Sequence, residues 1–299
     1  MRLSLGVVLT AISGLAAVQA APSLAPRQSI STLTPAQVAA YKPYSFYAAT
    51  AYCQPANTLA WNCGGNCNSN PSFHPVASGG NGDTTQFWYV GYDSTLRSVI
   101  VAYQGTDTSK IMPIVTDGNF FLESLDSSLF PGVSSSVQVH NGFKDAQAKS
   151  ATAVLSAVQT AMSRNGATSV TIVGHSLGGA IALLSSVYLP LHLPAGTTFK
   201  TVTYGMPRVG NQAFADYVDA HASVSHINNK RDIVPIVPGR FLGFHHPKGE
   251  KHIVDSGAWI DCPGQDNTDA QCTIGYVPNV FDGASGDHAG PYDGVHMGC

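Results

Sequence analysis

The sequence predicts a single α/β domain, with a mostly parallel central sheet covered by helices on both faces. Short apolar, β-branched segments alternate along the chain with segments of helical periodicity, and the connections between them are long enough to contain a helix. The 299 residues are 44% hydrophobic and only 11% charged, which is typical of a chain with a large buried core and excludes a disordered one.

The first part of the chain predicts two helices, a loop and a hairpin. The pair Thr34–Pro35 is an N-cap and first-turn signal for one helix, and a second helix is expected to follow Pro43. Residues 63–83 are rich in Gly, Asn, Ser and Pro, so we expect a loop there. Residues 86–93 and 98–105 are β-branched and aromatic with a turn between them, which predicts two paired strands.

The middle of the chain predicts alternating helices and strands. Residues 144–163 carry apolar side chains at helical spacing and are followed by Asn165–Gly166, a left-handed helix end. Residues 169–174 are a short apolar run typical of a buried strand, residues 180–189 are helix-forming, and residues 199–205 predict a further strand. This order requires parallel strands joined by helical crossovers, as in an α/β fold.

The N-terminal segment indicates secretion. Residues 1–20 have one cation at Arg2, an apolar stretch and a small residue at Ala20, which together predict a secretory signal peptide and an extracellular protein. Residues 21–27 are a possible pro-peptide, which leaves residues 28–299 as the expected domain. No later apolar run is long enough for a transmembrane anchor.

The charge balance restricts the classes of partner that the chain could bind. A net charge of -3 without a run of like charges indicates no binding surface for nucleic acid or for an acidic membrane.

Six cysteines in a secreted chain predict three disulfides rather than a zinc site. Short loops favour two of the pairs and leave the third, so the expected bonds are Cys63–Cys67, Cys262–Cys272 and Cys53–Cys299.

The strongest chemical signal is the segment Gly174–Gly178, which reads Gly-His-Ser-Leu-Gly. It fits G-x-S-x-G, and an apolar strand enters it while a helix leaves it, which is the setting of a nucleophilic serine on a sharp turn. Glycines are needed there because side chains would collide, and the helix that begins at Leu177 directs free N–H groups toward a developing oxyanion. Ser176 is therefore the expected nucleophile.

A serine hydroxyl needs an imidazole base, and the base needs a carboxylate that holds its tautomer. In this architecture the acid and the histidine follow the serine in that order. Asp232 is the preferred acid because it stands where a β-type run gives way to a polar turn; the other acids considered are Asp216, Asp219, Asp255 and Asp261. His288 is the preferred base because it lies in a Gly- and Pro-rich loop; His296 is its competitor, and a structural hairpin is expected to hold His245, His246 and His252. A metal cluster of these three histidines with Glu250 is disfavoured, because adjacent strand residues point to opposite sides.

Taken together, these segments resemble the fungal class 3 lipase family, which includes triacylglycerol lipases and feruloyl esterases. The resemblance spans the expected mature chain and rests on VAYQGT (101–106), VHNGF (139–143), VGHSLGG (173–179), TYGMPRVGN (203–211), NKRDIVPIVP (229–238) and HPKGEKHI (246–253). It implies an α/β-hydrolase fold and the same triad, Ser176, Asp232 and His288. The bond between Cys53 and Cys299 also matches the family.

The resemblance also implies an oxyanion hole and a lid. Thr106 would supply its backbone N–H and hydroxyl, with the N–H of Leu177 as the second donor. A lid would follow Thr106, with an apolar face made of Ile111, Met112, Ile114 and Val115. His140 and His175 are interpreted as orienting or packing histidines.

We therefore expect a secreted monomeric serine ester hydrolase without a cofactor or metal, acting as a triacylglycerol lipase at an oil–water interface. A feruloyl or other carboxylic esterase is the alternative, and a catalytically inactive binding protein on the same scaffold is a remote one.

Overall fold

Nine strands form the larger of the two sheets within residues 29–106 and 121–299, the parts of the chain that the computed structural model describes. Their order is β1-β13-β12-β10-β8-β7-β4-β3-β2. The central strands β4, β7, β8, β10 and β12 are parallel neighbours, while β2 and β3 on one side and β13 and β1 on the other are antiparallel. The chain therefore has the α/β-hydrolase fold that the sequence predicts, with a sheet that is parallel in its centre.

The strands of this sheet are β1 (Ser31–Thr32), β2 (Phe73–Gly79), β3 (Trp88–Asp93), β4 (Ser98–Tyr103), β7 (Ser169–His175), β8 (Thr198–Tyr204), β10 (Val224–Asn229), β12 (Glu250–Ile253) and β13 (Trp259–Cys262). A smaller sheet contains β5 (Leu122–Ser124), β6 (Gln138–His140), β9 (Gly210–Asn211) and β11 (Phe244–His245). The helices are α1 (Pro35–Ala39), α2 (Lys42–Thr50), α3 (Pro55–Ala60), α4 (Gly65–Asn68), α6 (Asn141–Asn165), α7 (Leu177–Tyr188), α8 (Gln212–His221) and α9 (Thr273–Tyr276).

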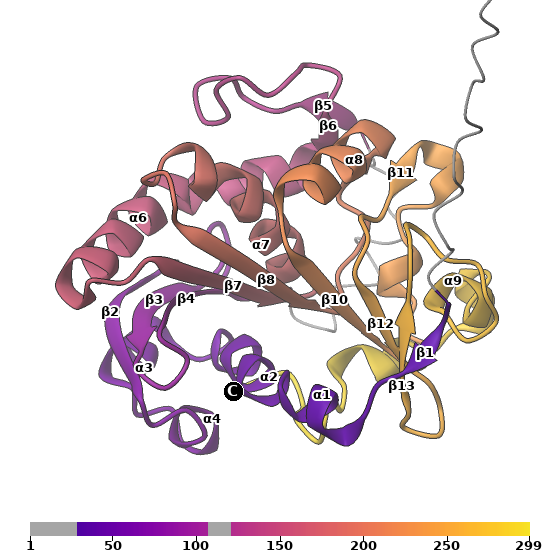
Figure 1. Cartoon of the computed structure of the whole chain (residues 1–299), viewed down its shortest axis with the longest axis horizontal. Coiled ribbons are helices and arrows are strands. Elements are labelled where there is room, and N and C mark those ends of the chain that lie inside the picture. Colours follow the sequence, from indigo (N-terminus) through magenta and orange to yellow (C-terminus); the bar gives the residue numbers. More distant parts are fainter. Residues whose placement is uncertain (1–28, 107–120) are drawn as a thin grey trace, which may run out of the picture.

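Helices cover both faces of the large sheet, with α6, α7 and α8 on one side and α1 to α4 on the other (Figure 1). Strand β4 illustrates this arrangement, because its side chains point alternately into a core on each face of the sheet. Val99, Val101 and Tyr103 pack in the core that includes α6 and α7, whereas Ile100 and Ala102 pack with the tyrosines of α2. All of these side chains are buried, as expected for a strand with helices on both faces.

The expected helices and strands are largely present, but the loop expected at residues 63–83 is wrong. It contains the short helix α4 and the seven-residue strand β2, which pairs with β3 and has a bulge between Pro75 and Ala77. The segment lacks the apolar alternation of a half-buried strand. Because β2 lies at the edge of the sheet, it needs only one partner and tolerates a proline, so its composition resembles that of a loop.

The single hairpin expected to hold His245, His246 and His252 is not found in the described residues: His252 lies in the hairpin of β12 and β13, whereas His245 lies in β11. Strand β11 pairs with β9 in the small sheet, and β12 pairs with β10 and β13 in the large one. Two of the histidines nevertheless lie against backbone carbonyls: His246 Nε2 donates to the Pro235 carbonyl oxygen, and each ring nitrogen of His252 lies within 2.8 Å of a backbone carbonyl oxygen. The short strands β11 and β12 therefore belong to different sheets.

Three disulfides join the six cysteines in the pairing that the sequence analysis expects: Cys53–Cys299, Cys63–Cys67 and Cys262–Cys272. The first joins residues 246 positions apart and attaches the C-terminus to the segment after α2. It therefore brings the last residues of the chain close to Tyr52, a side chain of the candidate site.

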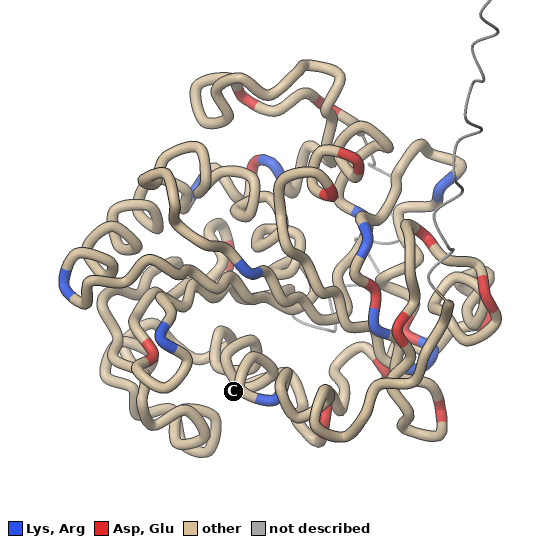
Figure 2. Tube along the Cα trace, in the orientation of Figure 1, with Lys and Arg blue, Asp and Glu red and all other residues tan. Residues whose placement is uncertain are grey.

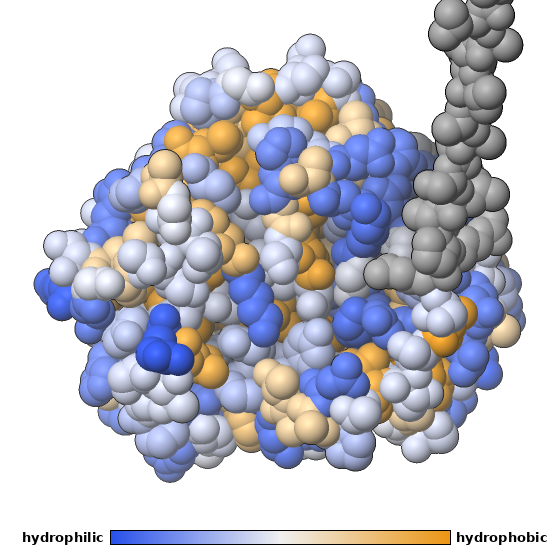
Figure 3. Space-filling model, in the orientation of Figure 1, coloured by the Kyte–Doolittle hydropathy of each residue, from blue (hydrophilic) through white to orange (hydrophobic). Residues whose placement is uncertain are grey.

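Along the described part of the trace, Lys and Arg positions are interspersed with Asp and Glu positions, and both signs lie together near β12 and β13 (Figure 2). On the face shown in Figure 3, hydrophobic residues lie in small groups among hydrophilic ones. Within the described ranges, no helix is both long and apolar enough to cross a membrane.

We predict that removing the Cys53–Cys299 bond lowers the free energy of unfolding more than removing Cys63–Cys67. The loop closed by the first bond is far longer, so the bond restricts the unfolded chain more, and losses of about 2–5 kcal/mol are typical of native disulfides in secreted domains. Urea unfolding of the two double Cys→Ser variants measures the difference. An equal or larger loss for the Cys63–Cys67 variant would contradict the prediction.

Candidate active site

The site lies at the edge of the large sheet where its parallel strands end. Ser176 follows β7, Gly205 follows β8 and Asp232 follows β10. Carboxyl ends of adjacent parallel strands lie side by side, and ligands of open α/β sheets bind there. The backbone N–H of Ser176 donates to the carbonyl of Tyr204 at 2.9 Å, which joins the turn after β7 to the end of β8.

A strained turn presents Ser176. Its backbone has φ 58° and ψ −129°, which is rare for a residue with a side chain. The turn requires its flanking glycines: a Cβ on Gly174 would lie 2.1 Å from the Gly178 carbonyl oxygen, and one on Gly178 would lie 2.2 Å from that of Tyr103. The G-x-S-x-G spacing therefore follows from close backbone packing.

Asp232 and His288 form a buried pair, each with about 1% of its surface exposed. His288 Nδ1 donates to Asp232 Oδ2 at 2.7 Å, while the backbone N–H of Val234 donates to Oδ1 at 2.9 Å. With its proton held on Nδ1, the neutral imidazole keeps a lone pair on Nε2. This Nε2 atom is buried and has no hydrogen-bond partner among the described residues.

No hydrogen bond therefore joins Ser176 Oγ to His288 Nε2 in the described part of the chain, but several contacts place the two residues at the same edge. A Cβ on Gly205, the residue after β8, would lie 2.9 Å from both the His288 ring and Asp232 Oδ2. The ring of His175, next to Ser176 in sequence, lies 4.3 Å from that of His288 between centroids. Catalytic hydrogen bonds are often long before substrate binds.

Hydrogen bonds hold the loop that carries His288 against the loop that carries Asp232. The N–H of Arg231 donates to Asp287 Oδ2 at 3.1 Å, and the side-chain amide of Asn229 donates to the Asp287 carbonyl at 2.8 Å. The N–H of Ala284 donates to the Arg231 carbonyl at 2.7 Å. His288 is therefore positioned by the loop that carries Asp232, although 56 positions separate the two residues.

A second chain of hydrogen bonds reaches His288 from the other side. His175 Nε2 lies 2.8 Å from the His288 carbonyl oxygen and must donate to it, so Nδ1 is the acceptor for the Tyr52 hydroxyl at 2.6 Å. Burial, and next the proximity of His288, hold the pKa of His175 well below its ordinary value. His175 thus stays neutral, and the sequence analysis was right to interpret it as an orienting histidine. The part played by Tyr52 was missed, because it contacts a residue 123 positions away in the sequence.

The candidate oxyanion donors lie beside Ser176. Leu177 is the first residue of α7, so its N–H has no acceptor within the helix. Thr106 follows β4, and its hydroxyl is buried without a hydrogen-bond partner in the described residues. Gly105 packs against Ser176, because a Cβ on it would lie 3.0 Å from Ser176 Cβ and 2.2 Å from the Tyr52 hydroxyl. An oxygen placed between Thr106 and Leu177 could accept hydrogen bonds from both.

The competing candidates lie elsewhere. His296 is exposed, Asp216 is exposed on α8, and His245 lies 3.3 Å from Asp266. The one metal-like group found in the described ranges, Glu250 with Cys262 and Cys272, contains a disulfide, whose sulfurs are not available as thiolate ligands. The expected lid residues, Ile111, Met112, Ile114 and Val115, lie outside the described residues.

The chain is similar to known lipases. The family profile described as Lipase (class 3) matches residues 100–242. The secreted mono- and diacylglycerol lipase MDL2 of Malassezia globosa is 33% identical over 73% of this chain and 74% of its own length, and MDL4 of the same organism is 31% identical over 98% and 94%. The structure of Rhizomucor miehei triacylglyceride lipase superposes with a TM-score of 0.78 at 26% identity, covering 90% of this chain and 98% of that one.

We predict that Tyr52→Phe lowers kcat about fivefold and changes KM less than twofold. The substitution removes the hydrogen bond that the Tyr52 hydroxyl donates to His175 Nδ1, and one neutral hydrogen bond contributes about 1 kcal/mol. Tyr276→Phe, which removes a hydroxyl remote from Ser176, is the matched control. Steady-state kinetics on a soluble ester measures both.

His175 variants separate positioning from packing. Glutamine can place an amide N–H near the position of Nε2, and asparagine is too short to do so. We expect His175→Gln to retain at least tenfold more of kcat than His175→Asn. Equal kcat values in the two variants would show that the hydrogen bond to the His288 carbonyl does not matter.

Proposed function

The chain belongs to the class 3 lipase family, and from this premise we propose that Ser176, Asp232 and His288 hydrolyse the ester bonds of acylglycerols. One observation carries the proposal: within the described residues, His288 Nε2 and the Thr106 hydroxyl are buried without a hydrogen-bond partner. Unsatisfied buried polar atoms are costly in a folded protein, so their presence indicates a function. Here they are the atoms that a serine hydrolase uses as base and oxyanion donor.

The proposed reaction has two halves. His288 Nε2 accepts the proton of Ser176 Oγ as this oxygen attacks the ester carbonyl, and Asp232 stabilises the imidazolium that forms. Thr106 and the N–H of Leu177 donate to the oxyanion. His288 then gives the proton to the leaving alcohol, which yields an acyl-serine; water attacks this intermediate by the same path and releases the fatty acid.

Acylglycerols are the preferred substrate class because the relatives are named for them. MDL2 and MDL4 are secreted mono- and diacylglycerol lipases, and the Rhizomucor protein is a triacylglyceride lipase. This chain, too, is secreted. Hydroxycinnamate esters, the alternative from the sequence, have no support in these names. No cofactor takes part in the proposed reaction, and the intact Asp232–His288 pair argues against an inactive binding protein.

We infer further that the monomeric protein meets its substrate at a lipid surface. Phe281 in the short helix Val280–Asp282 is 93% exposed, and Phe241 in Arg240–Leu242 is 90% exposed. The first precedes His288 in the sequence and the second follows Asp232. Both large apolar side chains face water, and burying them in a lipid surface would remove their apolar area from water.

Ser176→Ala is expected to remove essentially all ester hydrolysis and all labelling by a fluorophosphonate, which reacts with activated serines. Ser163→Ala, an exposed serine on α6, is the matched control and should be labelled like the unaltered protein. Mass spectrometry of the labelled protein identifies the modified residue. Labelling that persists in Ser176→Ala would refute the assignment of the nucleophile.

The lipid-surface inference makes a separate prediction. Phe241→Ser with Phe281→Ser should lower the rate on emulsified triacylglycerol at least tenfold relative to the rate on a dissolved ester, because burying one such side chain contributes about 1.5–3 kcal/mol. Leu59→Ser, a half-exposed leucine on α3, is the control. A ratio of emulsion rate to soluble rate that stays constant would count against docking through these side chains.

A further inference from the structure

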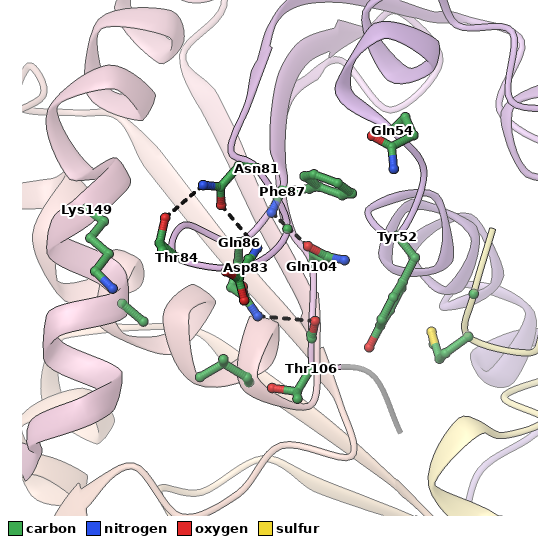
Figure 4. A pocket seen from close by; sticks show the side chains of 16 residues that line it. Tyr52, Gln54, Asn81, Asp83, Thr84, Gln86, Phe87, Gln104, Thr106 and Lys149 are labelled. Carbon is green, nitrogen blue, oxygen red and sulfur yellow. Dashed lines mark hydrogen bonds between the residues drawn. The ribbon is translucent and has the colours of Figure 1, made fainter. Parts of the chain in front are cut away.

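A polar pocket of about 710 Å³ adjoins the candidate oxyanion donors (Figure 4). Thr106 and Leu177 border it, so a substrate whose carbonyl oxygen lies between them has its neighbouring groups at the entrance. The walls come from the loop between β2 and β3, the end of β4, helix α6 and the segment after α2. Neither Ser176 nor His288 lines it, so the pocket is additional to the reacting groups.

Neutral hydrogen-bonding side chains dominate the wall: Tyr52, Gln54, Asn81, Thr84, Gln86 and Gln104. One cation, Lys149, and one anion, Asp83, are the charged members and cancel each other. This balance favours a neutral ligand over a phosphate or a carboxylate. A hydrocarbon chain would displace water from these amides without replacing their hydrogen bonds, which is unfavourable.

Backbone contacts orient two of these amides. Gln104 Oε1 accepts from the backbone N–H of Phe87 at 2.9 Å, and its NH₂ group makes no hydrogen bond in the described residues. The NH₂ group of Gln86 donates to the Gly105 carbonyl at 3.4 Å, and its Oε1 likewise accepts none. The pocket thus presents one free donor and one free acceptor on either side of the chain segment that carries Thr106, and hydroxyl groups can bond to either kind of group.

We propose that this pocket binds the free hydroxyl groups of the glycerol half of the substrate, and so favours mono- and diacylglycerols over triacylglycerols. The proposal rests on the hydrolysis of acylglycerols proposed above. In a triacylglycerol every hydroxyl is esterified, so an acyl chain would have to enter the polar wall. In a partial glyceride a free hydroxyl can donate to Gln86 Oε1 or accept from the Gln104 amide. A triacylglycerol would leave these polar groups of the pocket unpaired, and this lowers its kcat/KM relative to that of a partial glyceride.

The test compares four dissolved butanoate esters: the monoglyceride, the diglyceride, the triglyceride and the methyl ester. All are used below their solubility limits, so a lipid surface plays no part. The diagnostic variant is Gln104→Glu, which is nearly isosteric, keeps an oxygen for the Phe87 N–H and removes only the free donor. Gln271→Glu, an exposed glutamine whose side chain makes no hydrogen bond in the described ranges, controls for the added charge.

Gln104→Glu should lower the ratio of kcat/KM for the monoglyceride to that for the triglyceride about three- to tenfold, the effect of losing one neutral hydrogen bond. The ratio of monoglyceride to methyl ester should fall equally, and Gln271→Glu should change neither. A variant that lowers kcat/KM equally for all four esters, or for none, would overturn the proposal.

Gln54→Leu provides a second readout if the first variant is unstable. Gln54 is exposed at the pocket and makes no side-chain hydrogen bond in the described part of the chain, so its replacement leaves the fold intact. An apolar wall should raise the triglyceride rate relative to the monoglyceride rate, and an unchanged ratio would contradict this. If the unaltered protein hydrolyses none of the four esters, the proposed function fails; if it hydrolyses all four and the ratios stay constant in both variants, only the pocket proposal fails.

Discussion

The left-handed turn at Ser176 is the constraint on which the site depends. A residue with a side chain at φ 58° and ψ −129° costs about 1–3 kcal/mol, and the fold retains it because the surrounding backbone is closely packed. Gly174 and Gly178 let strand β7, helix α7 and the end of β4 approach within a distance that a Cβ would prevent. This packing places the start of α7, the serine and the Gly105–Thr106 segment together.

Two hydrogen-bond networks then hold the histidine against this turn. On one side Asp232 and the backbone around Asp287 fix the ring and its loop, and on the other Tyr52 and His175 hold the His288 carbonyl. The Tyr292 hydroxyl donates to the same carbonyl at 3.0 Å. These hydrogen bonds leave the ring of His288 little freedom. Its Nε2 atom makes no structural hydrogen bond in the described residues and is available for proton transfer.

Patterns of a few neighbouring residues were enough to predict the central strands, the turn at Ser176 and the order of acid and histidine. Apolar runs mark the strands, and the G-x-S-x-G segment marks the turn. Short loops between cysteines likewise predicted the disulfides. Strand β2 was missed because an edge strand with a proline has the composition of a loop. Strand β11 was placed in the wrong pairing because its partner β9 is distant in the sequence. The contact of Tyr52 with His175 spans 123 positions, and no local signal in the sequence could reveal it.

The most direct test is a crystal structure of the protein after reaction with an alkyl phosphonate, which mimics the tetrahedral intermediate. We expect phosphorus bonded to Ser176 Oγ, and one phosphonyl oxygen about 3 Å from the backbone nitrogens of Thr106 and Leu177. His288 Nε2 should lie within hydrogen-bond distance of a second oxygen. A phosphonate on another residue, or an oxygen directed away from Thr106 and Leu177, would contradict the proposed chemistry.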